Sequence, residues 1–155
     1  MISEAVLEEK AELEDFLVVV FGEDYRVMAR QHIAEMFSNA LSRPIFLLKR
    51  QESRIMASVA ISEALFTTHT WGIGWVAVHP EQRGNGLGQE IVKAALEAIA
   101  VRVKVPSTAI LSAYPEGAGF YNRLGFAGAT MDHAGNPFLS RKVCPNASGV
   151  IPIRA

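Results

Sequence analysis

The chain has a single cysteine, Cys144, among its 155 residues. One cysteine cannot form an internal disulfide, and the histidines show no short metal-ligand spacing, so we predict no disulfide and no metal. The sequence also lacks an apolar run long enough to cross a bilayer. Its first residues are acidic where a secretory signal would be basic. We therefore expect a soluble, cytoplasmic protein without a membrane partner.

An excess of charge of either sign is also absent. The chain has 15 basic and 16 acidic residues, with 50% hydrophobic and 20% charged residues overall. This balance favours a folded protein over a disordered one and gives no basic surface for nucleic acid. We expect residues 1–155 to form one domain, with a core over about residues 3–143 and an irregular tail over 144–155.

A glycine-rich turn between an apolar stretch and a helical pattern is the most informative part of the chain. The stretch Val76-Ala77-Val78-His79-Pro80 leads to Arg83-Gly84-Asn85-Gly86-Leu87-Gly88-Gln89, and apolar residues then recur at the spacing of one helix face. The first amides of a helix have no internal partner and carry the positive end of its dipole, so such a turn suits an anion. Its glycines would let a diphosphate approach the backbone, and Arg83 could add a charged donor.

Two common phosphate-binding motifs do not fit this turn. Gly88 is followed by Gln89 and Glu90, whereas a P-loop needs Lys and then Ser or Thr. The spacing of Gly84, Gly86 and Gly88 also differs from the dinucleotide fingerprint. A glycine loop that only reverses the chain remains an alternative on these residues alone.

Helical periodicity predicts two helices at the start of the chain. The first would be capped by Ser3 and end at Gly22, and the second would be capped by Asp24 and end before Pro44. The residues expected to face inward are Val6, Leu13, Leu17 and Val20 in the first helix, and Ile33, Met36, Phe37, Ala40 and Leu41 in the second.

Strand patterns and turn residues divide the remainder of the chain. We predict strands over 45–49, 54–61, 71–78, 108–113, 126–131 and 138–143, and helices from Leu87 to about Val103 and over 116–124. The first three strands should be antiparallel neighbours. Residues 51–53 and 132–136 have the composition of hairpin connections.

In two blocks the sequence resembles the GNAT-type N-acetyltransferases. Val78-His79-Pro80 and Arg83-Gly84-Asn85-Gly86-Leu87-Gly88 match the family's V-x-P step and R/Q-x-x-G-x-G/A motif, and Phe120-Tyr121-Asn122-Arg123-Leu124-Gly125-Phe126 is similar to its late F-Y-x-x-x-G-F segment. The resemblance implies an α/β fold. Its central sheet would be mixed and mostly antiparallel, with about six or seven strands and about four flanking helices, and the central strands 71–78 and 108–113 would splay apart.

The resemblance further implies transfer of an acetyl group from acetyl-CoA, a co-substrate, to a primary amine by direct attack in a ternary complex. The pantetheine arm would lie between the splayed strands, and the diphosphate would bind the glycine turn. Tyr121 resembles the family's general acid for the departing thiolate. Tyr114 stands where relatives often have an Asn that contacts the arm. The implied cofactor-binding residues are Val76, Ala77, Val78, Arg83, Gly84, Asn85, Gly86, Leu87, Gly88, Gln89 and Tyr114.

The general base is not evident from the sequence. Many relatives carry a carboxylate in the strand before the glycine turn, but residues 71–78 contain none. Glu63 is our candidate, with His79 or ordered waters as alternatives. Gly72 and Gly74 leave room on one strand face, either for a ligand or for the leading helices. The alternative function is a non-catalytic acyl-CoA sensor, and the sequence leaves both the acceptor and the oligomeric state, including a homodimer, open.

Overall fold

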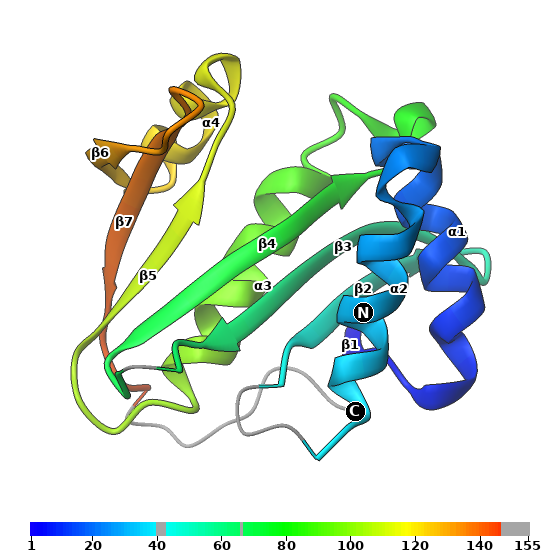
Figure 1. Ribbon diagram of the computed structural model, residues 1–155, viewed down its shortest axis with the longest axis horizontal. Helices are drawn as coiled ribbons and strands as arrows, with labels where there is room; N and C mark the ends of the chain where they lie inside the picture. Colours follow the sequence, from blue (N-terminus) through cyan, green and yellow to red (C-terminus); the bar gives the residue numbers. More distant parts are fainter. Residues whose placement is uncertain (40–42, 66, 147–155) are drawn as a thin grey trace.

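The computed structural model describes residues 1–39, 43–65 and 67–146, and in them a seven-stranded sheet carries helices on both faces (Figure 1). The strand order is β1-β2-β3-β4-β5-β7-β6. Every neighbouring pair is antiparallel except β4 and β5, which are parallel. This arrangement confirms the mixed, mostly antiparallel sheet. The strands are β1 (Ile2–Glu4), β2 (Ile45–Gln51), β3 (Arg54–Glu63), β4 (Thr70–Val78), β5 (Ser107–Ser112), β6 (Ala127–Met131) and β7 (Pro137–Val143).

Helices α1 (Lys10–Phe21) and α2 (Arg26–Met36) cover one face of the sheet, and α3 (Leu87–Ala100) covers the other (Figure 1). The short helix α4 (Ala118–Arg123) contacts β7. The core accordingly has two layers, one built around α3 and one around α1 and α2. Helices α1, α2 and α3 each bury apolar residues against the sheet, which is the usual reason for such a layered arrangement.

The structure corrects the predicted start of the first helix. Ser3 does not cap it, because Ile2–Glu4 form β1 and pair with β2. A 3-10 turn over Leu7–Glu9 follows, α1 begins at Lys10, and the side chain of Val6 is 40% exposed rather than buried. A strand this short has too few residues to show a period, so its pairing with β2 decides its conformation.

The second predicted helix also begins later than expected. Asp24 lies in a 3-10 turn, and Tyr25 occupies the N-cap of α2, so Asp24 is not its cap. Ile33 is fully buried as predicted, while Met36 and Phe37 are partly buried. The predicted inward residues Ala40 and Leu41, and positions 147–155 of the predicted tail, lie outside the described residues.

Strands β4 and β5 separate soon after they meet, as the sequence resemblance implied. Their pairing is limited to Thr70–Gly72 and Thr108–Ile110, and Figure 1 shows the two strands diverging beyond this point. Strand β5 instead pairs with β7 along its whole length. Among the described residues, no strand pairs with the main-chain groups of β4 that face β5 beyond Gly72.

A bulge at Trp75 changes the faces on which β4 presents its side chains. The β3–β4 register shifts between Ser58 and Ala60, and Trp75 has a φ of +49°. The Ser58 hydroxyl donates to the Trp75 carbonyl at 3.1 Å. Ile73 and Val76 consequently pack toward α3, whereas Trp75 packs toward α1 and α2. In a regular strand Trp75 would share the face of Ile73, so the extra residue moves Trp75 to the face of α1 and α2 and returns Val76 to that of α3.

Candidate active site

The start of α3 presents a row of main-chain N–H groups that lack internal partners. Gly86 is the N-cap, and both Gly84 and Gly86 are left-handed, with φ of +80° and +81°. The first helical hydrogen bond runs from the Glu90 amide to the Gly86 carbonyl at 3.0 Å. Within the described part of the chain, the amides from Gly84 to Gln89 donate no hydrogen bond to a main-chain carbonyl. Such a row at the positive end of a helix dipole can bind an anion.

The side chains of this turn are open to solvent. Arg83 and Asn85 are both exposed, and the Asn85 amide donates to Gln82 Oε1 at 3.3 Å. Leu87 and Gly88 are half-buried where the helix meets the sheet. The predicted diphosphate-binding residues therefore form one continuous surface rather than a buried corner.

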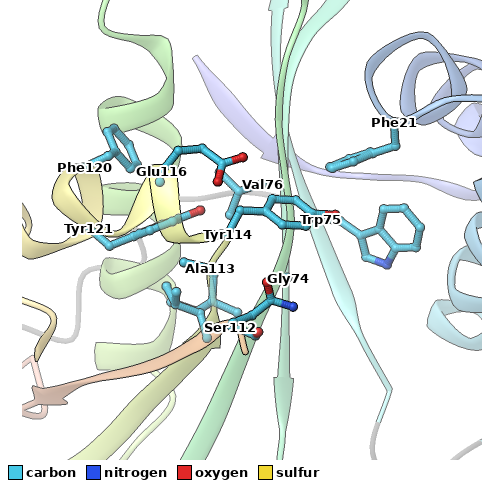
Figure 2. Close-up of a pocket in the computed structure, with 14 residues that line it drawn as sticks. Phe21, Gly74, Trp75, Val76, Ser112, Ala113, Tyr114, Glu116, Phe120 and Tyr121 are labelled. Carbon is cyan, nitrogen blue, oxygen red and sulfur yellow. The ribbon is translucent and has the colours of Figure 1, made fainter. Parts of the chain in front are cut away.

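A cavity of about 480 Å³ fills the opening between β4 and β5 (Figure 2). It brings together residues from five parts of the fold: Ile73, Gly74, Trp75 and Val76 of β4, Leu111 to Tyr114 at the end of β5, Glu116, Gly117, Phe120 and Tyr121 around α4, Phe21 of α1 and Asn136 before β7. Three of the predicted site residues, Val76, Tyr114 and Tyr121, therefore line one cavity. Ala77 and Val78 lie beyond it along β4.

Tyr121 projects from α4 into this cavity (Figure 2). Its ring packs edge-on against Phe120 and Phe126, with centroid separations of 4.9 and 6.0 Å. Burial raises the pKa of Tyr121 above its ordinary value of 10.0, because the charged phenolate is the form that loses hydration. The phenol is therefore protonated at neutral pH and can donate a hydrogen bond or a proton into the cavity.

Tyr114 occupies a more exposed part of the cavity, with 58% of its surface accessible. Its hydroxyl lies 3.4 Å from that of Tyr25, and this hydrogen bond raises the pKa of Tyr114 above 10.0. The contact joins the loop after β5 to the turn before α2. Tyr114 thus connects the two sides of the opening.

Glu63 does not lie with these residues. It pairs with Trp71 toward the start of β4, and it lines neither this cavity nor the neighbouring one of about 320 Å³. The alternative residue His79 accepts a hydrogen bond from the Glu81 amide at 3.3 Å, which supports its interpretation as a turn residue. The sequence placed Glu63 at a strand end, but the distance from there to the cavity depends on the pairing of β3 with β4.

Glu116 was missed by the sequence analysis. Among the described residues that line the larger cavity, it has the only carboxylate (Figure 2). It lies in the 3-10 turn Pro115–Gly117, which the sequence suggested only as the start of a short helix. Its position shortly before Tyr121 in the second sequence block could have drawn attention to it.

The loop between β6 and β7 supplies a polar edge to the cavity. The Asp132 carboxylate accepts hydrogen bonds from the amides of Asn136 and Ala134, each at 2.9 Å, and from the Asn136 side chain at 3.1 Å. The bond from the Asn136 amide is the main reason that the pKa of Asp132 is below its ordinary value. This network confirms the predicted turn over 132–136 and places Asn136 at the cavity.

Other chemical groups lie away from the cavity. Cys144 is exposed and does not line it. Within residues 1–39, 43–65 and 67–146, no three His, Cys, Asp or Glu side chains are grouped so that they could hold a metal ion. No helix in those same ranges combines the length and apolar character needed to span a bilayer.

Comparison with protein families identifies the family to which this fold belongs. The model of the acetyltransferase (GNAT) domain matches residues 42–127, which are more than half of the chain. The chain therefore belongs to the GNAT acetyltransferase family. No curated protein matches it in sequence.

Solved structures share this fold at low sequence identity. An aminoglycoside 6'-N-acetyltransferase complexed with coenzyme A is 15% identical, with a TM-score of 0.77 over 94% of this chain and 98% of that one. The PaiA N-acetyltransferase from Thermoplasma acidophilum, also with coenzyme A, is 15% identical, with a TM-score of 0.72 over 92% and 98%. A ribosomal-protein-alanine N-acetyltransferase from Escherichia coli is 14% identical, with a TM-score of 0.70 over 97% of both chains.

Proposed function

We propose that this protein transfers the acetyl group of acetyl-CoA to a primary amine. The row of unpartnered amides from Gly84 to Gln89 carries the proposal, because it gives an anion-binding surface beside the opening between β4 and β5. The coenzyme A complexes of two proteins with this fold support acetyl-CoA as the co-substrate.

The cofactor would lie along the open edge of β4. Its diphosphate would bind the amides from Gly84 to Gln89, with Arg83 as an added charge. The His79 amide donates to the Met56 carbonyl of β3 at 2.8 Å. Because successive residues of a strand direct their main-chain N–H and C=O groups to alternate sides, those of Val78 point away from β3, to the open side. The pantetheine arm would pair there like an added strand, past Ala77 toward Val76 in the cavity wall.

The chemistry begins with an amine that is protonated in water and must lose its proton before its lone pair can attack a thioester. The described lining of the cavity offers Glu116 as a proton acceptor, whereas Glu63 would need a chain of waters to act. As the nitrogen–carbon bond forms, the acetyl oxygen gains charge, and an amide on the open edge of β4 would stabilise it.

The second half of the reaction breaks the carbon–sulfur bond. The electron pair leaves with the sulfur, and the coenzyme A thiolate needs a proton. Tyr121 is suited to supply it, because its phenol faces the cavity and burial keeps it protonated at neutral pH. The nitrogen loses its second proton as the amide forms, and this proton would restore the Tyr121 phenol. The products are the N-acetylated amine and coenzyme A.

Two measurements test this proposal. Titration calorimetry of the purified chain should detect binding of both coenzyme A and acetyl-CoA, and a thiol assay should detect coenzyme A release that depends on added amine. A non-catalytic sensor would bind both ligands but show no amine-dependent release. The absence of heat with either ligand would overturn the proposal as a whole.

A further inference from the structure

Aromatic rings form the wall of the cavity on the side of α1 and α2. Phe21, Trp75 and Tyr114 line it, and Phe21 contacts Trp75 edge-to-face with ring centroids 5.4 Å apart. Tyr25 packs behind them, with its ring centroid 6.4 Å from that of Trp75. Figure 2 shows Phe21 and Trp75 on one side of β4, with Tyr121 on the other. The proposed cofactor site lies on the side of α3 and α4. The aromatic wall lies on the opposite side of β4, so it is available to contact the acceptor.

Trp75 is held in place before any ligand binds. Its indole N–H donates to His32 Nδ1 at 2.9 Å, and the two rings cross edge-to-face with centroids 5.7 Å apart. The bulge described above fixes its backbone on the same face. A rigid aromatic surface loses little freedom when it binds a ligand, which favours apolar contact.

Gly74, beside this wall, leaves open space. A Cβ built on Gly74 would meet no atom of the described residues within 4 Å, so α1 and α2 do not fill the room that this glycine provides. Gly74 lines both the larger cavity and the smaller one of about 320 Å³, which also includes Gly72, His32 and Glu35. The sequence allowed Gly74 to make room either for a ligand or for the leading helices, and this open space supports the ligand.

The charges around the two cavities are few and of one sign. Glu116 is the charged side chain in the described lining of the larger cavity, and Glu35 is the carboxylate in that of the smaller one. No Lys or Arg lines either cavity among the residues that the structure describes. A bound cation would therefore find one carboxylate beside the proposed reaction site, and a bound carboxylate would find no cationic partner.

We propose that the acceptor is a small amine with one positive charge and an aromatic or apolar body. The proposal rests on the acetyl transfer proposed above. Phe21, Trp75 and Tyr114 would cover the body of the amine, and Glu116 would face its nitrogen. A polyamine or an aminoglycoside would bring several ammonium groups to the larger cavity, where Glu116 is the one carboxylate of the described lining and Glu35 lies in that of the smaller cavity. An amino acid would bring an unpaired carboxylate.

A substrate panel tests the inference with the intact chain. With acetyl-CoA saturating, kcat/KM is measured for 2-phenylethylamine, L-phenylalanine, spermidine and kanamycin by coenzyme A release. We expect 2-phenylethylamine to exceed each of the others by at least about tenfold, because each of the others leaves a charge unpaired in the cavity. L-Phenylalanine is the matched control, since it differs only by its carboxylate. Equal or better use of any of the other three would overturn the inference.

A binding measurement separates this inference from the proposed function. Tryptophan fluorescence of the coenzyme A-loaded protein should report 2-phenylethylamine, and Phe21→Leu should weaken that binding about fivefold through loss of the ring contact. The affinity for coenzyme A should stay unchanged. Val27→Ala, a 65% exposed position on α2, is the control that should alter neither affinity.

The outcomes point to different failures. If the wild-type protein showed no binding of coenzyme A, both the proposed function and this inference would be overturned. Retained coenzyme A binding together with preferential binding of spermidine or kanamycin would overturn the inference alone. Preferential binding of 2-phenylethylamine without turnover would overturn the proposed transfer and support the ligand class.

Discussion

The ring of Phe120 lies directly over Gly88. A Cβ built on Gly88 would be 3.4 Å from Phe120 Cζ and 3.7 Å from Val78 Cγ2. Gly88 is in the first turn of α3, Phe120 precedes Tyr121 in α4, and Val78 ends β4. This contact therefore holds the amide row, the open edge of β4 and the proposed acid in one fixed arrangement.

The first prediction concerns the space at Gly88. Gly88→Val should lower the free energy of unfolding by about 1–3 kcal/mol, because its methyl groups would displace the Phe120 ring. It should also weaken coenzyme A binding. Gly88→Ala is the matched control, since 3.4 Å is an ordinary contact for a single methyl group. Urea unfolding and calorimetry measure both effects, and a Val variant that behaves like the Ala variant would contradict the close contact.

The second prediction concerns backbone conformation at Gly86. Its φ is +81°, while a Cβ there would meet no atom within 4 Å, so any penalty is conformational rather than steric. Gly86→Ala should lower the free energy of unfolding by about 1–2 kcal/mol. Gly86→Asn should cost less, because Asn adopts left-handed conformations more readily. If both variants were as stable as the wild type in urea, this conformation would not be strained for a side chain.

The third prediction concerns the phenol of Tyr121. Tyr121→Phe should lower kcat about 100-fold by removing the proton donor while keeping the ring. The affinity for coenzyme A should be unchanged in calorimetry. Tyr114→Phe is the comparison, and its effect should fall mainly on KM because its hydroxyl bonds to Tyr25. Wild-type turnover of the Tyr121→Phe variant at every pH tried would remove Tyr121 from the mechanism.

The fourth prediction concerns the dependence of Tyr121 on pH. Since burial raises its pKa, the protonated phenol persists in the folded state above pH 10, where an exposed tyrosine ionises. The stability associated with this residue is therefore complete below pH 10 and is lost as pH rises through the folded-state pKa. Urea unfolding between pH 8 and 11 should show a steeper alkaline loss in the wild type than in Tyr121→Phe. Identical slopes would contradict the burial effect.

The fifth prediction concerns Glu14, which joins α1 to α2. Hydrogen bonds from Arg30 and Arg26, at 2.8 and 2.9 Å, lower its pKa from 4.5 to about 2. Its contribution to stability is thus present above pH 4.5 and is lost as pH falls toward 2. Glu14→Gln should lower the free energy of unfolding by about 1 kcal/mol at pH 7, and this difference should shrink at low pH.

The control for Glu14 is Glu8→Gln, an exposed position in the 3-10 turn before α1. Thermal unfolding of both variants from pH 7 to pH 3 provides the comparison. A difference between Glu14→Gln and the wild type that stays constant over this range would show that the two arginines do not act through its charge. The ion pairs of Glu14 with Arg26 and Arg30 matter for the site because they join α2 to α1, and α1 carries Phe21 to the cavity wall.

Much of the fold was predictable because its strands and main helix carry local patterns. The residues after Leu87 repeat at helical spacing, and Ile45 to Ile61 divide into two apolar runs around Glu52 and Ser53, which adopt positive φ in the hairpin turn. Strand β1 was missed because its residues show no period and depend on β2 for their hydrogen bonds.

The candidate site was only partly predictable. Sequence spacing indicated the glycine turn and Tyr121, because both depend on local backbone chemistry and on a recognisable family pattern. Glu116 and the aromatic wall were not apparent, since Phe21, Trp75 and Tyr114 are distant in the chain and come together only through the packing of α1 and the end of β5 against β4. Glu63 remains a sequence-based candidate for the base, although the structure places it toward the other end of β4.

Local sequence alone indicates where an anion can bind, because glycine conformation and free helix amides are properties of a few adjacent residues. Which residues face the reacting atoms depends instead on long-range packing. The bulge moves Trp75 from the face of Ile73 to that of α1 and α2, and the separation of β4 from β5 opens the cavity between these strands. Both features depend on pairing between strands far apart in the chain, which no local pattern encodes.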